Sequence, residues 1–198
     1  MLPSFREPNT RGAHAVANSG PGGALPHSMS IDNPTGDPVD IGYMRHAIAL
    51  AQEAVDKPGA SPVGCIIVLD GQVVGAAHNE VGMRHDPTAH AEIVAIRRAC
   101  ESLGRDDLRG ATLYSTLQPC GMCSMASIWT SIRRIVYGAT RADVHRMYFE
   151  DRHLGVLDIV DDAFRDDMIV QGGLLGAECA AFYYKPDDQP PIPAQANI

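Results

Sequence analysis

Hydrophobic and polar positions alternate in blocks from about residue 37 onward, and each block has the period of a helix or a strand. Apolar residues recur at every third or fourth position after Asp37 and Pro38, which together favour a helix start, so a helix is predicted over about 38–55. The run 63–69 is apolar and rich in β-branched residues, and it predicts a strand. Asp70-Gly71 is typical of a hairpin turn, after which 72–77 predicts a second strand.

Helical and extended patterns alternate in the remainder of the chain. Helices are predicted over about 90–103, 120–129 and 174–184, and strands over 111–116, 134–137 and 168–170. The acidic segment that precedes the last strand is expected to be irregular. Strands that alternate with helices after an initial hairpin indicate a three-layer α/β domain with a mixed sheet.

The two ends of the chain lack an apolar period. Residues 1–36 are rich in Gly, Pro, Ser and Asn, which predicts a flexible N-terminal tail, and Met29 is an alternative start of the protein. Residues 186–198 contain four prolines and are expected to form a short C-terminal tail. One folded domain is therefore predicted over 37–185.

Composition narrows the class of protein. The 198 residues carry a net charge of −8 and the pI is near 5.4, a balance that opposes binding to a polyanion such as a nucleic acid. We expect no membrane span, because no apolar run approaches about 20 residues, and the start of the chain does not resemble a secretory signal. Five cysteines with one CxxC pair indicate metal or thiol chemistry in a cytoplasmic protein.

Candidate chemistry concentrates in TAHAE and QPCGMC, which contain His90, Glu92, Cys120 and Cys123. Zinc favours about four tetrahedral ligands, and catalytic zinc sites leave one of these positions to water. Each motif is predicted to open a helix, where the positive end of the helix dipole favours thiolates. Glu92 is too close in sequence to His90 to be needed as a ligand, but it is well placed to exchange protons with a water at the metal.

Other interpretations of the cysteine pair remain open, because an isolated CxxC is also typical of structural zinc and redox sites. A closed zinc site would need a fourth protein ligand, for which Cys65, Cys100 and His85 are candidates, although none has a paired spacing. Cys65, Cys100 and Cys179 lie in apolar surroundings and are expected in the core. In contrast, HxE followed about 30 residues later by PCxxC matches a signature of zinc-dependent deaminases, which favours a catalytic site.

Three stretches, DPTAHAEIVAIRRAC, LYSTLQPCGMC and RRIVYGA, resemble the cytidine deaminase-like superfamily, and the resemblance runs from about 43 to 184. It is closest to guanine deaminase-like nucleobase deaminases, and the motifs are also similar to those of tRNA adenosine deaminases. The resemblance implies a five-stranded mixed sheet flanked by helices, and a homodimer. It also implies that His90, Cys120 and Cys123 bind Zn²⁺ and that Glu92 is the catalytic proton shuttle.

The same resemblance implies a set of substrate-binding residues. Asn79 matches an asparagine that holds the base, Ala91 lies within the HAE motif, and Trp129 matches a tryptophan that packs on the base in guanine deaminase-like proteins. A plain core role for this tryptophan is the alternative. Asp151 in YFED matches an acidic residue that approaches the substrate, with Glu150 as the other candidate.

Two departures from the guanine deaminase pattern keep the substrate open. The chain has SPVGCI where those proteins usually have GGPFGA, and Gln118 stands where Glu usually precedes the PC pair. Hydrolytic deamination of a free nucleobase or related amino-heterocycle (guanine-like, cytosine-like or an aminotriazine) is the leading hypothesis. A tRNA-specific adenosine deaminase and a non-hydrolytic binding scaffold are the alternatives. Acidic residues crowd the C-terminal third, which disfavours tRNA, although they also suit a solvated face.

Overall fold

The computed structural model describes residues 36–149 and 154–190. Its helices are α1 (Pro38–Val55), α2 (Val81–Arg84), α3 (Ala91–Leu103), α4 (Gly121–Trp129), α5 (Val156–Asp162) and α6 (Gly176–Ala180), with a short 3-10 helix η1 (Arg146–Tyr148). Its strands are β1 (Ser61–Leu69), β2 (Gln72–Asn79), β3 (Thr112–Leu117), β4 (Arg134–Ala139) and β5 (Ile169–Gln171). Almost all of the predicted N-terminal tail, and the last eight residues of the predicted C-terminal tail, lie outside the described residues.

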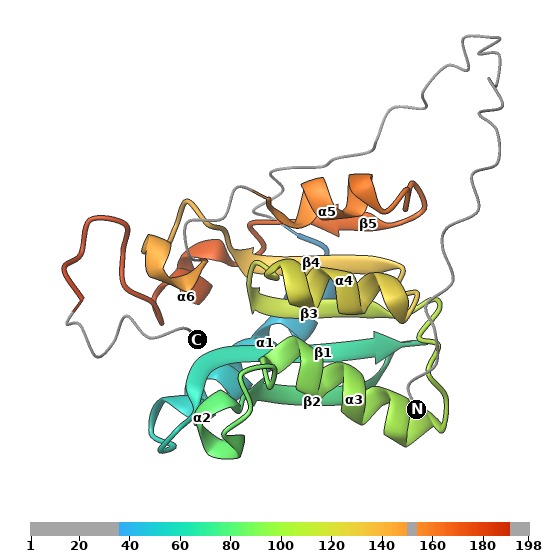
Figure 1. Ribbon diagram of the computed structural model, residues 1–198, viewed down its shortest axis with the longest axis horizontal. Coiled ribbons are helices and arrows are strands. Elements are labelled where there is room, and N and C mark those ends of the chain that lie inside the picture. The colour runs from blue at the N-terminus through green and yellow to red at the C-terminus, as the bar shows by residue number, and fades with distance from the viewer. Residues whose placement is uncertain (1–35, 150–153, 191–198) are drawn as a thin grey trace, which may run out of the picture.

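The five strands form one mixed sheet in the order β2-β1-β3-β4-β5. β1 pairs antiparallel with β2 and β3, whereas β3, β4 and β5 are parallel. In Figure 1, α3 and α4 lie in front of this sheet and α1 lies behind it, which confirms the predicted three-layer α/β architecture. Because Leu117 pairs with Ala139 in the parallel register, the carboxyl ends of β3 and β4 meet at one edge of the sheet.

The elements predicted up to residue 171 are confirmed to within two residues, but the expectation of an irregular acidic segment is wrong. That segment contains α5, which begins after Gly155, whose N–H donates a hydrogen bond to the Asp158 carboxylate at 2.7 Å. Val156 and Val160 lie one turn apart on this helix and are both buried. The seven residues of this helix, VLDIVDD, are too short a stretch for their apolar pattern to indicate a helix in the sequence.

The last helix is also shorter than predicted, because α6 ends at Ala180. Tyr183 lies beyond that end, and its buried hydroxyl forms hydrogen bonds with Thr116 Oγ1 at 3.0 Å and with the Pro62 carbonyl at 3.1 Å. These bonds tie the C-terminal segment to β1 and β3. A buried hydroxyl needs such partners, so they compete with continuation of the helix.

A buried polar network holds α1 to the sheet, at the amino-terminal end of β4. The Asp40 carboxylate accepts hydrogen bonds from both terminal nitrogens of Arg134, at 2.8 and 2.6 Å, and from the Tyr114 hydroxyl at 2.6 Å. Arg134 also donates to Gln171 Oε1 at 2.6 Å, so the network joins α1 to β3, β4 and β5. Paired in this way, a charged residue is compatible with a buried position.

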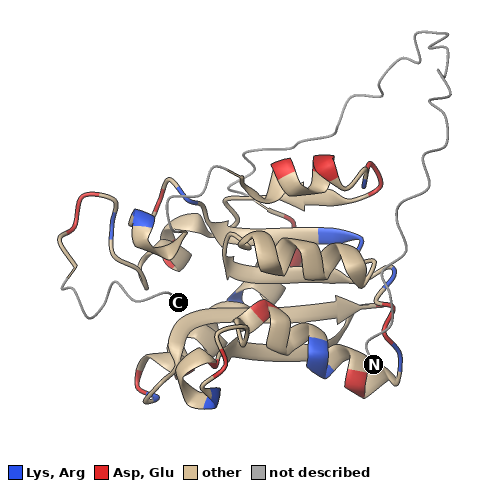
Figure 2. Cartoon of the chain, viewed as in Figure 1, with Lys and Arg blue, Asp and Glu red and all other residues tan. Residues whose placement is uncertain are grey.

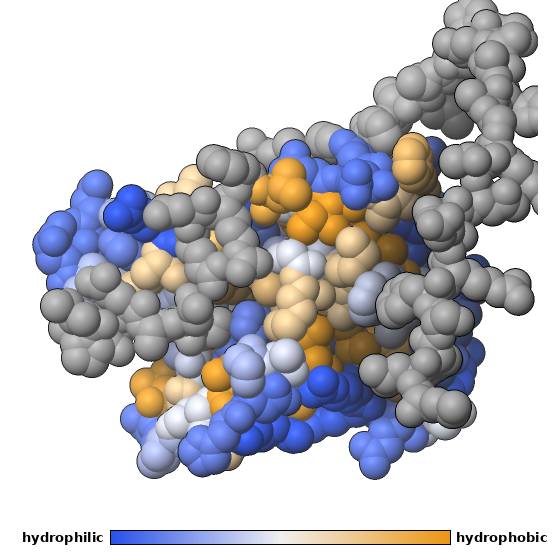
Figure 3. Space-filling view, viewed as in Figure 1, coloured by the Kyte–Doolittle hydropathy of each residue, from blue (hydrophilic) through white to orange (hydrophobic). Residues whose placement is uncertain are grey.

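The charged surface is uneven. Figure 2 shows acidic residues along α5, where Asp161 and Asp162 are exposed, in agreement with a solvated face at this part of the acidic run. Figure 3 shows hydrophilic side chains over α2 and α3, whereas apolar side chains gather around α4 and α5.

Among the described residues, no helix is long and apolar enough to cross a membrane.

Candidate metal centre and its pocket

The HxE and CxxC motifs meet where two helices begin beside the carboxyl end of β3. His90 is the N-cap of α3, and Cys120 is the N-cap of α4, so each motif opens a helix as predicted. Pro119 lies between the end of β3 and the start of α4 and separates the two elements. The positive ends of both helix dipoles therefore point toward the same group of side chains, which favours anionic ligands there.

Three donor atoms form a compact triangle. Cys120 Sγ lies 3.7 Å from His90 Nδ1, Cys123 Sγ lies 3.6 Å from the same nitrogen, and the two sulfurs are 3.7 Å apart. Tetrahedral zinc with Zn–S bonds of about 2.3 Å and Zn–N bonds of about 2.0–2.1 Å requires sulfurs about 3.8 Å apart and sulfur–nitrogen distances of about 3.6 Å. The triangle therefore has the dimensions of three ligands around one zinc ion.

The group that could hold a metal consists of His90, Cys120 and Cys123 among the described residues. Cys65, Cys100 and His85, the sequence candidates for a fourth ligand, are not part of it. Three protein ligands are the number typical of catalytic zinc sites, whereas structural sites are usually closed by a fourth.

The surroundings of Cys120 stabilise its thiolate, the form that binds metal. The hydrogen bond with Cys123 lowers the pKa of the Cys120 thiol to about 4, and His90 acts in the same direction. Burial raises the pKa of Cys123 well above its ordinary value. Burial opposes the charged form of His90, but the hydrogen bond with Cys120 and the charge of Glu92 outweigh it and raise the pKa of the imidazole.

Glu92 lies on the first turn of α3 and is 4% exposed. Ser115, on β3, donates a hydrogen bond from Oγ to Glu92 Oε1 at 3.3 Å and so orients the carboxylate. Burial raises the pKa of Glu92 above its ordinary value. Because Glu92 lines the same small pocket as His90 and Cys120, it is placed to exchange a proton within that pocket.

Two of the four predicted substrate-binding residues lie beside the metal-binding group. Asn79 ends β2, lines the pocket and is 2% exposed, and its amide oxygen accepts a hydrogen bond from the Val81 N–H at 3.1 Å. This bond leaves the amide NH₂ group as the donor that Asn79 offers to a ligand. Ala91 lies between His90 and Glu92, and its side chain is fully buried.

The other two predicted residues are not placed at the pocket. Trp129 is the last residue of α4 and is 79% exposed. Nine residues of helix put it roughly 13 Å beyond Cys120, so within one chain it neither lines the pocket nor fills the core. Asp151 and the alternative Glu150 lie outside the described residues.

The pocket has walls that were not among the predicted site residues. Besides the predicted groups it is lined by Val63, Leu117, Gln118, Tyr148 and Phe149, and its volume is about 20 Å³. Two of these had a signal in the sequence: Gln118 precedes the PC pair, and Phe149 lies two residues before Asp151. Val63 and Leu117 read as ordinary strand residues, so only the folded sheet brings them to the site.

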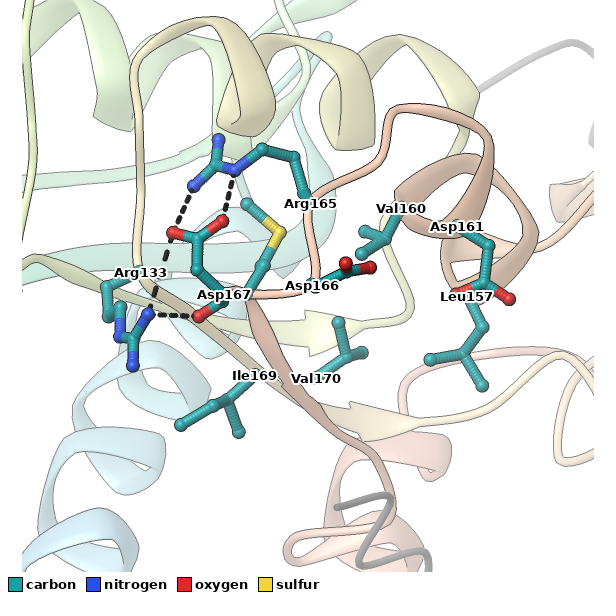
Figure 4. Close-up of a pocket in the computed structure, with 10 residues that line it drawn as sticks. Arg133, Leu157, Val160, Asp161, Arg165, Asp166, Asp167, Ile169 and Val170 are labelled. Carbon is teal, nitrogen blue, oxygen red and sulfur yellow. Dashed lines mark hydrogen bonds and ion pairs between the residues drawn. The ribbon is translucent and has the colours of Figure 1, made fainter. Parts of the chain in front are cut away.

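A second, larger cavity of about 200 Å³ lies between α5 and β5 (Figure 4). Asp167 at its wall forms ion pairs with Arg133 and Arg165, and Leu157, Val160 and Val170 supply apolar lining. The lining contains neither His nor Cys, so it lacks the donors that zinc prefers. The smaller pocket beside His90 is therefore the candidate site for chemistry.

Comparison with known proteins agrees with this geometry. Residues 38–139 match the family model of the cytidine and deoxycytidylate deaminase zinc-binding region. A tRNA-specific adenosine deaminase of Agrobacterium fabrum is 45% identical over 97 residues, which are 49% of this chain and 63% of that protein, so the chain spans less than two thirds of this relative. A guanine deaminase of Bacillus subtilis is 38% identical over 109 residues, which are 55% of this chain and 70% of that protein.

Similarity to solved structures extends beyond the matched family segment. A structure from studies of A-to-I editing by tRNA:A34 deaminases is 35% identical, with a TM-score of 0.59 over 71% of this chain and 98% of that chain. Guanine deaminase from Nitrosomonas europaea, at 23% identity and a TM-score of 0.64 over 74% of this chain and 82% of that chain, shares the fold.

Proposed function

The chain belongs to the family defined by the cytidine and deoxycytidylate deaminase zinc-binding region, and from this premise we propose that it is a hydrolytic deaminase of a free nucleobase or related amino-heterocycle. Guanine-like and cytosine-like rings and aminotriazines are the candidate substrates. The observation that supports the proposal most directly is the triangle of His90, Cys120 and Cys123 beside the buried carboxylate of Glu92.

In this proposal His90, Cys120 and Cys123 hold the zinc ion. Zinc, when bound, lowers the pKa of a coordinated water to about 7 and so supplies a nucleophile at neutral pH. The reaction consumes one water and converts the ring C–NH₂ group into C=O with release of ammonia. The protein must therefore move protons from the attacking water to the leaving nitrogen.

Glu92 is the group proposed to move these protons. Its carboxylate takes a proton from the attacking water and then donates a proton to the leaving amino group. Ser115 donates a hydrogen bond to one carboxylate oxygen and so helps to orient Glu92, which lines the pocket. Asn79 donates from its amide NH₂ to an acceptor on the ring, so that the reacting carbon is presented to Glu92.

The pocket's composition favours a small neutral ring over a polyanion. None of the described residues that line it is Lys or Arg, and the net charge of the chain is −8. Phosphate contacts from basic side chains normally supply much of the affinity for nucleic acids. Tyr148 and Phe149 instead offer aromatic surface against which one ring can pack.

A tRNA-specific adenosine deaminase is the alternative proposal. It is supported by the 45% identity to the Agrobacterium fabrum protein and by the likeness to the tRNA:A34 deaminase structure. The same zinc group and Glu92 would perform the chemistry, because the reaction at an adenine C–NH₂ bond needs the same proton transfers. The two proposals differ in the surface around the pocket, which would have to bind the rest of a tRNA in the alternative proposal.

A homodimer and a cytoplasmic location complete the proposal. Trp129 supports the homodimer, since a tryptophan 79% exposed at the end of α4 is suited to contact with a second chain. The small-molecule substrate then remains the principal partner. The cytoplasmic location continues to rest on the pattern of cysteine usage.

The proposed function is tested by ammonia release from a panel of compounds. Guanine, cytosine, adenine, isoguanine, aminotriazines, their nucleosides and a tRNA anticodon stem-loop are each incubated with the zinc-loaded protein. We expect turnover of at least one free base and little reaction of the stem-loop. Turnover of the stem-loop without any free base would establish the tRNA alternative, and zinc-loaded protein that releases ammonia from no compound would point to a binding scaffold.

Variants of the same protein test the assigned roles. Glu92→Gln keeps the size of the side chain but cannot accept a proton, so turnover should fall at least about 100-fold while one zinc per chain is retained. Cys123→Ala should lose zinc in elemental analysis. Cys100→Ala, outside the metal-binding group, is the matched control and should keep it.

A further inference from the structure

Arg141 lies in a tight turn immediately after β4. The N–H and the hydroxyl of Thr140 both donate to Asp143 Oδ2 at 2.7 Å, and the Asp143 N–H donates to the Thr140 carbonyl at 3.1 Å. This closed set of bonds fixes the backbone of the turn, and with it the direction in which the Arg141 side chain leaves the sheet.

From this turn Arg141 contacts three separate parts of the structure around the pocket. Its backbone N–H donates to Gln118 Oε1 at 3.1 Å, and Gln118 lines the pocket just before the CxxC motif. Its Nη1 donates to the Leu154 carbonyl at 3.1 Å, in the segment that leads into α5. Its guanidinium carbon lies 5.1 Å from the centre of the Phe149 ring, within the range of a cation–π contact.

The two aromatic walls of the pocket are thus held by different parts of the chain. Tyr148 packs edge-on against Tyr183, with ring centres 5.2 Å apart, and its hydroxyl accepts a hydrogen bond from the Tyr184 N–H at 3.2 Å. The C-terminal segment therefore fixes Tyr148, whereas the guanidinium of Arg141 lies on Phe149.

We propose that Arg141 is a positioning residue, which fixes Phe149 as a preformed wall of the substrate pocket and thereby sets substrate affinity. This inference rests on the proposed deaminase function. Of the three contacts above, the one with Phe149 places the guanidinium against an aromatic wall of the pocket, so the effect of Arg141 on the substrate is expected through Phe149. Ordering the wall before the substrate arrives removes part of the entropic cost of binding.

The consequence for kinetics is a change in KM rather than in kcat. Loss of a contact that is equally strong in the ground state and the transition state raises KM and leaves kcat unchanged. For Arg141→Ala we expect KM to rise about tenfold, as for loss of a partly desolvated cation–π contact together with a hydrogen bond, with one zinc per chain retained. Arg141→Lys keeps a cation and a donor and should recover part of the loss.

The experiment compares these variants with a matched surface change. Arg45→Ala removes an exposed arginine from α1 and should leave KM within twofold of the wild type. A KM for Arg141→Ala that also stays within twofold would overturn the proposal. A fall in kcat together with loss of zinc would also overturn it, because Arg141 would then act on the metal centre.

A double-substitution cycle tests whether Arg141 acts through Phe149. Phe149→Leu keeps an apolar wall but removes the ring. In that background Arg141→Ala should raise KM less than twofold further, because the contact through which it acts is already gone. A full tenfold effect in the Phe149→Leu background would refute the route through Phe149.

Hydrogen exchange supplies a readout that needs no substrate. The Tyr148 N–H donates a hydrogen bond to the carbonyl of His145, which precedes η1, and the Phe149 N–H donates to the carbonyl of Arg146 in η1. Arg141→Ala should speed their exchange relative to α1, and unchanged exchange would contradict the positioning role. If the stem-loop proves to be the substrate, the kinetic comparison is made on the stem-loop, so failure of the nucleobase hypothesis is distinguished from failure of this inference.

Discussion

Replacement of Asp40 by Asn should destabilise the fold more than any other single loss of charge on α1. The Asp40 side chain is 11% exposed, and its carboxylate accepts three hydrogen bonds, two from Arg134 and one from Tyr114. Asp40→Asn removes the charge that faces the Arg134 guanidinium, which is itself 24% exposed and also donates a hydrogen bond to the neutral Gln171. Removal of one member of a buried pair costs about 3–5 kcal/mol, and the partial exposure of this pair places the expected loss at about 3 kcal/mol.

Thermal unfolding followed by circular dichroism measures this loss. For a domain of this size about 3 kcal/mol corresponds to a fall in Tm of roughly 6–12 °C. Glu53→Gln on the same helix is the control, because the Glu53–Lys57 pair is 61% and 42% exposed and should contribute less than about 1 kcal/mol. A second substitution, Arg134→Met, should recover part of the stability lost in Asp40→Asn, since it removes the unpaired charge.

The pH dependence supplies an independent check on the same network. The hydrogen bonds from Arg134, with a smaller contribution from Tyr114, outweigh burial and hold the pKa of Asp40 below its ordinary value. A carboxyl whose pKa is lowered by folding stabilises the fold above the unfolded pKa of about 3.9, and the contribution disappears as pH falls through the folded value. The Tm difference between wild type and Asp40→Asn should therefore be constant from about pH 5 to 7 and shrink below about pH 4. A difference below about 1 kcal/mol at pH 7, or one that persists undiminished in acid, would refute the reasoning.

Two further predictions concern packing and the N-terminal tail. Gly64→Ala should lower the free energy of unfolding by about 3 kcal/mol or more, because a Cβ there would lie 2.0 Å from the Ala47 carbonyl oxygen of α1. Gly42→Ala on α1, where a Cβ would have no atom within 4 Å, should instead raise it by up to about 1 kcal/mol through helix propensity. Urea unfolding compares the two variants, and equal effects would contradict the close approach of β1 to α1. Deletion of residues 1–28 should leave zinc content unchanged and lower Tm by less than about 5 °C, and a larger fall would show that this segment packs on the domain.

The metal-binding group was predictable from the sequence because its geometry is local. Cys120 and Cys123 are one turn apart on a helix that Pro119 helps to start, and His90 and Glu92 open the other helix. A spacing of three residues in a helix fixes the separation of two side chains, whatever the rest of the fold does. The remaining step, that the two helix starts meet, followed from the α/β pattern and from the family resemblance.

The walls of the pocket were harder to predict because they depend on contacts between distant segments. Val63 reaches the site because β1 and β2 pair with Ser61 opposite Asn79, and Gln118 is oriented by the backbone of Arg141. Trp129 is the opposite case: the family resemblance implied that it contacts the substrate, but within a single chain it is exposed and does not line the pocket. Sequence spacing does not encode either arrangement, since both follow from how the sheet and its connections pack.

This division explains why relatives with different substrates can resemble the chain almost equally. The family model ends at residue 139, so it contains the zinc group and Glu92 but ends before Arg141, Tyr148 and Phe149. Proton transfer at a C–NH₂ bond makes the same demands in a free base and in a nucleic acid, and Glu92, the residue proposed to meet them, lies inside the matched segment. Discrimination between substrates needs differential contacts, which a shared catalytic group cannot supply. We therefore expect the segment from Arg141 to Phe149 to contribute to substrate preference, because it adds pocket surface that the shared chemistry does not constrain.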